Sequence, residues 1–271
     1  MKQALLNSIL GHIALSARDR FDLLRALLRN PESAGTIVND WIAFSLVTKL
    51  CLPGKIFVDV GAHIGSVISE VHRNDKRVQI VAIEAIPEKA ERLRRTFPFA
   101  RIHQCAVGES RGKVSFFVHT LRSGYSSLSR PPEGDGAIQE IITPMDTLDN
   151  LISSPDVDVI KIDVEGAELG VIRGGKRVLS DCRPLVMFES APSGVGSLGY
   201  TKDALWRQLD ELGYQIFVPN RLAHDGDGLS LECFLDSHVY PRRTTNYFAV
   251  PEERRIEIRD RARLIRGIRP G

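Results

Sequence analysis

The sequence predicts an α/β fold: a doubly wound, mostly parallel sheet with an N-terminal helical extension and an inserted β-hairpin arm. The first observation is a set of short segments that are apolar almost without interruption, which is typical of strands covered on both faces. The second is that helical patterns separate most of these segments, as crossovers between parallel strands require. With 271 residues, 43% of them hydrophobic and 26% charged, the chain is long enough to bury a sizeable core.

Residues 1–52 are expected to form the helical extension. An apolar stripe runs from Leu6 to Leu28 at helical spacing. Polar residues such as Asn7 and Ser8 interrupt its start, which favours an amphipathic helix over a secretory signal. A second helix is expected over 39–50, because Pro53-Gly54 is a stop signal. The stripe should pack on the domain or on a partner subunit, so we expect a homodimer through this helix.

The main domain is expected to span 53–251, and an Arg-rich C-terminal helix and tail 252–271. The uninterrupted apolar segments, predicted as strands, are 56–60, 79–84, 101–106, 157–163 and 184–190. The predicted helices between and after them are 64–73, 87–96, 167–179 and 201–212. The hairpin arm is predicted from 114–119 and 138–143, and late strands from 214–218, 231–235 and 246–250.

The charge balance argues against nucleic acid as the main partner. The chain carries 36 basic and 34 acidic residues, a net charge of +2. The segment from Arg242 to Gly271 contains nine arginines and four acidic residues, so the excess of positive charge lies in the tail. This tail would be either a solvated helix or a contact for an anionic partner. Four widely spaced cysteines without a Cys-x-x-Cys pair predict free thiols and a cytoplasmic location. No apolar run approaches the ~20 residues that span a bilayer.

The first predicted strand ends in a glycine turn that leads directly into a helix. The turn reads Asp59-Val60-Gly61-Ala62-His63-Ile64-Gly65. Glycines there let the backbone approach a ligand, and the following helix N-terminus attracts its anionic group. A dinucleotide fingerprint would need a third glycine at position 66, which is Ser66. The spacing fits instead the acidic, Gly-rich turn of S-adenosylmethionine (SAM) binders, with His63 in place of the middle glycine. We expect Asp59, Gly61, Ala62, His63 and Gly65 to bind this cofactor.

Two further segments are expected to complete the cofactor site. Glu84 ends the second strand, where a carboxylate can accept hydrogen bonds from both ribose hydroxyls; the alternative is a solvated strand-end acid. Ala85 and Ile86 follow, and Ile86 is placed to cover an adenine face. Ala106 and Val107 close the third strand, the usual position for adenine contacts in this architecture.

In these segments, and in others further along, the chain resembles the FkbM-type SAM-dependent methyltransferases. The resemblance covers roughly 56–250, and its most specific element is Lys161-Ile162-Asp163-Val164-Glu165-Gly166-Ala167-Glu168. The other matching stretches are Val58–Gly65, Ala106–Gly108, Ser123–Leu128, Met145–Asp149, Arg173–Gly175 and Phe188-Glu189. The resemblance implies a class I methyltransferase fold, a seven-stranded Rossmann-like sheet, with SAM as cofactor. It also implies O-methylation of hydroxyls on polyketides, sugars or glycans.

The catalytic residues are expected at the ends of two central strands. Asp163 and Glu165 lie at the end of one strand, and the alternation of side chains places both on the same side of it. Lys161 lies on that side as well and could pair with one of them. Glu189 ends the next strand. Asp163 is expected to contact the cofactor as well. We interpret Glu168 as a complement to the helix dipole and His119 as an ordinary strand-end residue.

No metal site is predicted. Asp163 and Glu189 could suit Mg²⁺, which binds few carboxylates and keeps several waters. A third oxygen ligand after Glu189 is missing, because Ser190 follows.

The sequence therefore predicts a SAM-dependent methyltransferase, and O-methylation of a small-molecule or glycan hydroxyl is the expected reaction. The loops at 123–130 and 193–200 are expected to recognise the substrate. Two alternatives stay open at this point. An NAD(P)-dependent oxidoreductase shares the architecture, and a catalytically silent protein could keep the fold for binding alone.

Overall fold

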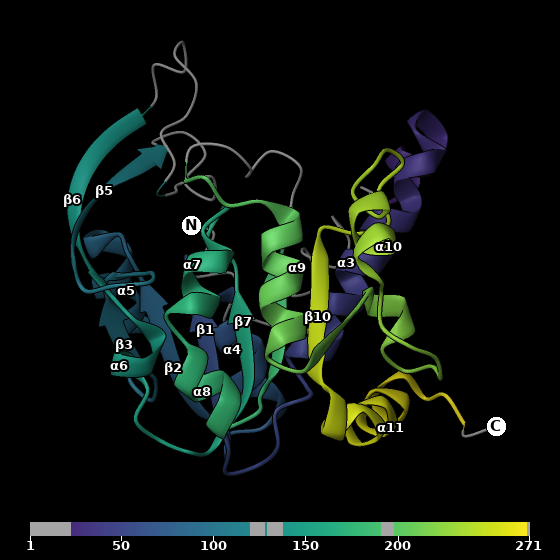
Figure 1. The fold of residues 1–271 in the computed structure, drawn as a ribbon. Helices are drawn as coiled ribbons and strands as arrows, with labels where there is room; N and C mark the ends of the chain where they lie inside the picture. The colour runs from purple at the N-terminus through teal and green to yellow at the C-terminus, as the bar shows by residue number, and fades with distance from the viewer. Residues whose placement is uncertain (1–22, 120–127, 129–137, 191–197, 270–271) are drawn as a thin grey trace.

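Figure 1 shows the computed structural model of the chain, in which helices lie on both faces of a central sheet. The structure describes residues 23–119, 128, 138–190 and 198–269. Most of the apolar stripe and most of the two predicted substrate loops therefore lie outside the described residues. A helix runs through 23–29, and no helix in the described ranges is both long and apolar enough to cross a membrane.

A seven-stranded sheet in the order β3-β2-β1-β7-β8-β10-β9 forms the centre of the fold. Its strands, in chain order, are β1 (Ile56–Val60), β2 (Gln79–Glu84), β3 (Arg101–Gln104), β7 (Val157–Ile162), β8 (Leu185–Glu189), β9 (Tyr214–Phe217) and β10 (Asn246–Pro251). Neighbours are parallel except for β10, which is antiparallel to both β8 and β9. The chain winds outward in both directions from β1 and β7, and ligands of such sheets bind at that switch point. The predicted doubly wound, mostly parallel sheet is confirmed.

The sheet separates two hydrophobic cores, each covered by its own helices. One core is covered by α7 (Glu168–Arg173), α8 (Lys176–Asp181), α9 (Lys202–Glu211) and α10 (Leu231–Asp236). The other is covered by α3 (Ala34–Val47), α4 (Ser66–Asn74), α5 (Pro87–Thr96) and α11 (Arg255–Arg266). Within β1, Val58 belongs to the first core and Phe57 to the second. Alternate residues of one strand thus face opposite cores, which explains why the strands read as uninterrupted apolar runs.

The predicted hairpin arm is present as a second, three-stranded sheet. Its strands β4 (Ala106–Val107), β5 (Gly112–His119) and β6 (Ile138–Asp146) lie in the order β4-β6-β5, and the pair β5 and β6 is antiparallel. Phe116 of β5 joins Ala85, Ile86 and Ala106 in a small apolar cluster. The arm therefore packs against the residues that follow β2.

Three element predictions are wrong, each for a local reason. Residues 231–235 belong to the helix α10 rather than a strand, and the Ser230 side chain caps it by accepting from the Cys233 N–H at 3.2 Å. The single helix predicted at 167–179 is divided into α7 and α8. Gly174 lies between them, and a Cβ there would stand 2.0 Å from the Gly108 carbonyl oxygen. The strand predicted at 101–106 is divided into β3 and β4, which belong to different sheets.

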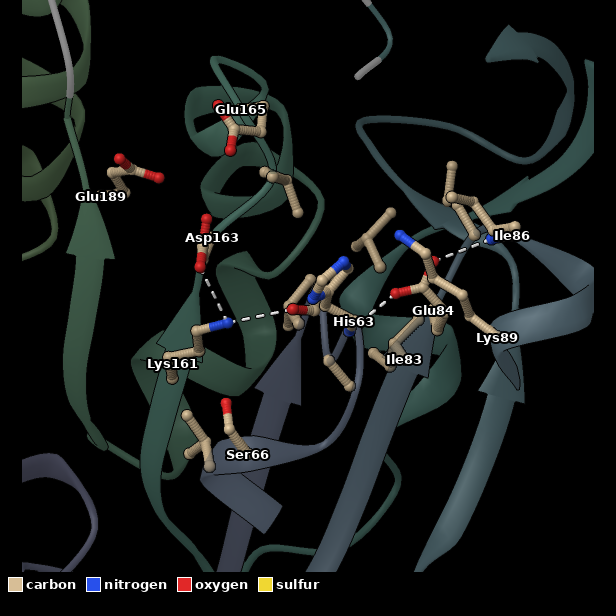
Figure 2. A pocket seen from close by; sticks show the side chains of 18 of the residues that line it. His63, Ser66, Ile83, Glu84, Ile86, Lys89, Lys161, Asp163, Glu165 and Glu189 are labelled. Carbon is tan, nitrogen blue, oxygen red and sulfur yellow. Dashed lines mark hydrogen bonds and ion pairs between the residues drawn. The ribbon is translucent and has the colours of Figure 1, made fainter. Parts of the chain in front are cut away.

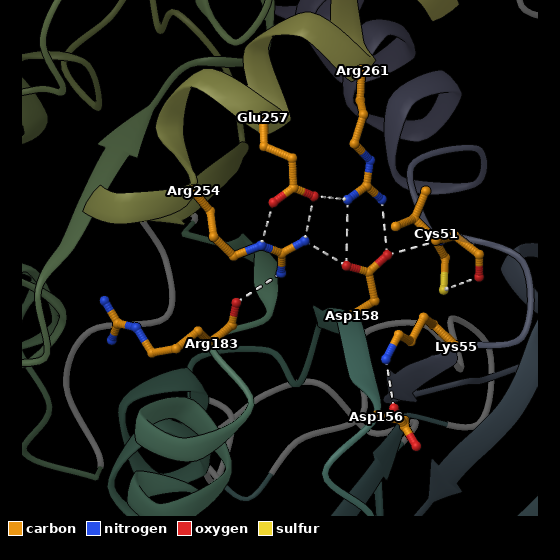
Figure 3. A network of polar contacts seen from close by, with 9 residues as sticks. Cys51, Lys55, Asp156, Asp158, Arg183, Arg254, Glu257 and Arg261 are labelled. Atoms are coloured by element: carbon orange, nitrogen blue, oxygen red, sulfur yellow. Dashed lines mark hydrogen bonds and ion pairs between the residues drawn. The ribbon is translucent and has the colours of Figure 1, made fainter.

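The Arg-rich C-terminal helix is packed into the domain. Asp158 on β7 is 4% exposed and accepts from Arg254 Nη2 at 2.6 Å and from Arg261 Nη2 at 2.8 Å. Figure 3 shows both guanidinium groups directed at this carboxylate. Arg259 and Arg263 of the same helix both pair with Asp225. The interpretation of this helix as solvated is therefore wrong for these arginines, since acidic groups of the chain itself hold them.

Candidate active site

A cavity of about 510 Å³ lies at the carboxyl ends of β1, β2, β7 and β8. Its walls also include residues of α3, β5 and β10. Figure 2 shows carboxylates at one end of this cavity and the Glu84 segment at the other. The cavity therefore occupies the switch point at which open α/β sheets bind their ligands.

The glycine turn after β1 forms the floor of the cavity. Gly61 has φ of +80°, and a Cβ at this position would stand 1.9 Å from the Asp163 carbonyl oxygen. Only glycine allows the two strand ends to approach this closely. Gly65 has φ of +81° and serves packing, because a Cβ there would stand 2.2 Å from the ring of Phe97. His63, between them, also has a positive φ, of +52°.

Glu84 is fixed by the backbone N–H groups of two residues that line the cavity. Its Oε2 accepts from the His63 N–H at 2.8 Å, and its Oε1 accepts from the Ile86 N–H at 3.0 Å. Burial raises the pKa of this carboxyl, whereas the two backbone N–H groups act in the opposite direction. Each carboxylate oxygen has two lone pairs, so each can accept one further hydrogen bond from a ligand. The alternative of a solvated strand-end acid does not hold, because Glu84 is 6% exposed.

Lys161 connects the glycine turn with the strand-end acids. Its Nζ lies 3.2 Å from Asp59 Oδ1, 3.2 Å from Asp163 Oδ2 and 3.0 Å from the Gly61 carbonyl oxygen. Asp59 is fully buried, and neither of its oxygens has a well-formed hydrogen bond within the described part of the chain. The Lys161 ammonium is thus the group that compensates this buried carboxylate. The contact with Asp163 is one of the two pairings predicted for Lys161, whereas the contact with Asp59 was not predicted.

Three carboxyl groups converge opposite the Glu84 segment. Asp163, Glu165 and Glu189, called the acidic cluster below, each place an oxygen within 4.8 Å of the other two. Such a set could hold a cation, although the prediction made from the sequence was that no metal binds. Glu165 has φ of +53°, an uncommon conformation for a residue with a Cβ and one that clusters at functional sites.

The three carboxyl groups differ in their protonation. Burial and the neighbouring Asp163 raise the pKa of Glu189 to about 10, so it carries a proton at neutral pH. Burial opposes ionisation of Asp163 as well, but the Lys161 ammonium and the hydrogen bond from Glu189 hold the pKa of Asp163 below its ordinary value. Burial and the Asp163 carboxylate raise the pKa of Glu165 to about 7. Glu165 therefore exchanges a proton in the range where a general base is most effective.

Glu168 holds the loop that carries Glu165. Its Oε1 accepts from the Val164 N–H at 3.2 Å and from the Gly166 N–H at 3.1 Å. Burial raises the pKa of this carboxyl to about 7, while those backbone hydrogen bonds oppose the rise. The residue is 6% exposed and does not line the cavity. Its contacts therefore stabilise the turn that precedes α7.

Most of the residues predicted for the site line this one cavity. They are Gly61, Ala62, His63, Glu84, Ala85, Ile86, Ala106, Val107, Asp163, Glu165 and Glu189. Asp59 and Gly65 do not line it: Asp59 lies beneath with Lys161, and Gly65 packs on α5. His119 lies on the arm, outside the cavity lining.

Several residues that line the cavity belong to none of the predicted site motifs. They are Asp40, Phe44, Ser66, Lys89, Phe116, Met187 and Asn246. Asp40 and Phe44 come from α3, and Asn246 begins β10. No motif marks Asp40, Phe44 or Asn246, because their shared position depends on contacts between segments some two hundred residues apart.

Comparison with known proteins places this geometry in a family. The family model described as "Methyltransferase FkbM domain" matches residues 59–216. Among solved structures, the methyltransferase FkbM from Methylobacillus flagellatus KT is 19% identical, with a TM-score of 0.45. That match covers 72% of this chain and 43% of the other, so the chain spans less than half the length of that protein.

Two other solved structures carry the cofactor or its product in their names. Fibrillarin from Aeropyrum pernix, in complex with S-adenosyl-L-methionine, is 15% identical over 78% of this chain and 76% of its own, with a TM-score of 0.38. The plantazolicin methyltransferase BamL, in complex with a triazolic desmethylPZN analog and SAH, is 9% identical over 93% of this chain and 97% of its own, with a TM-score of 0.40. None of the curated proteins matches the chain. Since the family model covers more than half of it, the chain belongs to the FkbM methyltransferase family.

Proposed function

We propose that the chain transfers a methyl group to a hydroxyl of a sugar, glycan, polyketide or other small natural product. Its cofactor is S-adenosylmethionine, in keeping with its family. The observation that supports the proposal is the position of Glu84 and the acidic cluster at opposite ends of one cavity. The first suits the nucleoside end of the cofactor and the second suits its positively charged sulfonium end.

The residues at the nucleoside end fit SAM in shape and in chemistry. Glu84, with one free lone pair on each oxygen, would accept hydrogen bonds from the two ribose hydroxyls. Ile86, Ala106 and Phe116 would enclose the adenine with apolar surface. Gly61, without a side chain, lets the cofactor lie against the backbone. When bound, SAM supplies an electrophilic methyl group on a cationic sulfur.

The acidic cluster would handle the proton of the methyl acceptor. Holding the hydroxyl in line with the methyl group contributes about 7–11 kcal/mol to the lowering of the barrier. Asp163, kept ionised by Lys161, would orient the hydroxyl by accepting its hydrogen bond. Glu165 would remove the proton, because a carboxylate with a raised pKa is the stronger base. Glu189 would hold Asp163 in place through the hydrogen bond that it donates.

The test of this proposal is a calorimetric titration of the protein with SAM. We expect Glu84→Gln to weaken SAM binding by about ten- to a hundredfold, since hydrogen bonds to a charged group contribute roughly 1.5–3 kcal/mol. Glu88→Gln is the matched control, because Glu88 is an exposed acid on the adjoining α5. Equal SAM affinity of Glu84→Gln and the wild type would refute the cofactor site. Binding of NAD(P) in place of SAM would favour the oxidoreductase alternative.

The homodimer and the cytoplasmic location stay predictions. In support of the homodimer, Leu24, Leu27 and Leu28 of the N-terminal helix are 58%, 50% and 84% exposed. Large apolar side chains exposed in one short helix favour a contact with another surface. Light scattering on the full chain would give the mass of two copies if the helix forms this contact, and of one copy if it does not.

A further inference from the structure

The cavity extends beyond the acidic cluster into a part of the chain outside the family match. Its distal end, defined here as Asp40, Phe44, Glu189 and Asn246, is built by α3, β8 and β10. The family model covers 59–216, so Asp40, Phe44 and Asn246 lie outside it. Strands β1, β7 and β8 lie between β2, which carries Glu84, and β10, which carries Asn246. The distal end is therefore on the methyl-acceptor side of the cavity.

Asp40 fixes the orientation of the Asn246 amide. Its Oδ1 accepts from Asn246 Nδ2 at 3.1 Å and from the Thr245 N–H at 3.1 Å, and its Oδ2 accepts from Thr245 Oγ1 at 3.1 Å. An ionised carboxylate can only accept hydrogen bonds, so the amide must turn its NH₂ toward Asp40. The second Nδ2 hydrogen is donated to Thr245 Oγ1 at 3.1 Å. Both amide donors are thus used, and Asn246 Oδ1 is left as a hydrogen-bond acceptor.

The neighbouring polar groups have the same character. Asp163, Glu165 and Glu189 present carboxyl oxygens, and the proton of Glu189 is directed to Asp163. Lys161 is the cation nearest to them, and its three N–H donors face three oxygens, those of Asp59, Asp163 and the Gly61 carbonyl. Apart from the proton that Glu165 exchanges near pH 7, the side chains of the described residues here therefore offer a ligand hydrogen-bond acceptors and negative charge. Phe44, 41% exposed, adds an apolar ring at the rim.

We propose that Asn246, held by Asp40, is a specificity-determining residue that makes the distal end bind a neutral, hydroxyl-rich methyl acceptor and reject an acidic one. Hydroxyl groups supply the donors that these oxygens require. A carboxylate, phosphate or sulfate supplies none and would be repelled by the acidic cluster. The inference rests on the proposed methyl transfer and names the chemical class of its substrate.

The test compares two small probes that differ in one group, methyl β-D-glucopyranoside and methyl β-D-glucopyranosiduronate. Their binding to the SAH-saturated protein is measured by ligand-observed NMR. We expect the neutral glycoside to bind at least about tenfold more tightly than the uronate, because like charges placed together are strongly unfavourable. Asp40→Asn should reduce this ratio, since the new amide can donate to Asn246 Oδ1 and let the Asn246 NH₂ turn into the cavity.

Two further variants keep the test decisive. Asn246→Leu preserves the size of the side chain but removes its oxygen, so it should weaken binding of the neutral glycoside and leave binding of the uronate unchanged. This variant also provides the test if Asp40→Asn does not fold. Asp210→Asn, at an exposed position on α9, is the matched control and should keep the wild-type ratio. The inference is overturned if the uronate binds as tightly as the glycoside, if the glycoside does not bind, or if neither site variant changes the ratio. If the wild-type protein does not bind SAH, the proposed function is overturned instead.

Discussion

Replacing Lys161 with methionine tests the electrostatic centre of the site. Lys161 Nζ lies 3.2 Å from one oxygen of Asp59 and 3.2 Å from one of Asp163. At an effective dielectric constant of about 20, each contact is a gross attraction of about 5 kcal/mol. Desolvation of the ions offsets much of this. The variant, however, leaves Asp59 fully buried without its cation, and breaking a buried pair in this way costs about 3–5 kcal/mol.

The assay is urea unfolding, followed by circular dichroism, of three proteins: the wild type, Lys161→Met, and the double variant Asp59→Asn with Lys161→Met. Removing both charges leaves no buried ion, so we expect the double variant to recover about half or more of the lost free energy of unfolding. The loss in the single variant should be a large fraction of the total, since domains of this kind are stable by about 5–15 kcal/mol.

The pH dependence of the single variant gives a second check. Burial raises the pKa of Asp59 in the folded state. A folded state that binds more protons than the unfolded state loses stability as the pH rises. The deficit of Lys161→Met relative to the wild type should therefore shrink as the pH falls from neutral toward the ordinary pKa of an aspartate. A deficit below about 1 kcal/mol at neutral pH, or a double variant no more stable than the single one, would refute the reasoning.

Two further predictions concern the C-terminal helix and the catalytic base. Asp158→Ala should cost about 3–5 kcal/mol of unfolding free energy in urea melts, because it removes the buried carboxylate that Arg254 and Arg261 share and leaves them only the more exposed Glu257 as an acidic partner. Asp156→Ala, which breaks only an exposed pair on the same strand end, should cost under about 1 kcal/mol; equal costs would contradict the argument. Glu165→Gln should lower kcat by about 10²–10⁴-fold and remove an ionisation near pH 7 from the kcat profile, whereas retention of that ionisation would assign it to another group.

Short-range patterns predicted much of this fold correctly. Strands β1 and β2 have the predicted bounds, because strands buried on both faces are apolar at nearly every position; the polar residues are Asp59 in β1 and the two end residues of β2. The glycine turn is equally local: the positive φ at Gly61 and Gly65 favours glycine wherever the chain turns in this way. Glu84, Asp163 and Glu189 could be placed at the cavity because each directly ends or follows a parallel strand.

Failures occurred where a long-range contact decides the local structure. Residues 101–106 read as one strand, but Ala106 pairs with Met145 of the arm rather than with β2. Residues 167–179 read as one helix, but the close approach of Gly174 to Gly108 divides it. The local sequence of neither segment indicates which distant residues it contacts. The hydrophobic periodicity therefore predicted that these residues are buried, but it could not predict which residues they contact.

The sequence by itself determined the sheet, the glycine turn and the acids at the strand ends, since each follows from residues adjacent in the chain. The tertiary structure decided which of these groups interact. It placed Asp59 beneath the cavity with Lys161, and it joined Asp40 to Asn246 across 206 positions. It also paired Arg254 and Arg261, from the C-terminal segment, with the buried Asp158. Pairings of this kind depend on the burial and geometry of distant segments, so they cannot be predicted from the spacing of residues in the sequence.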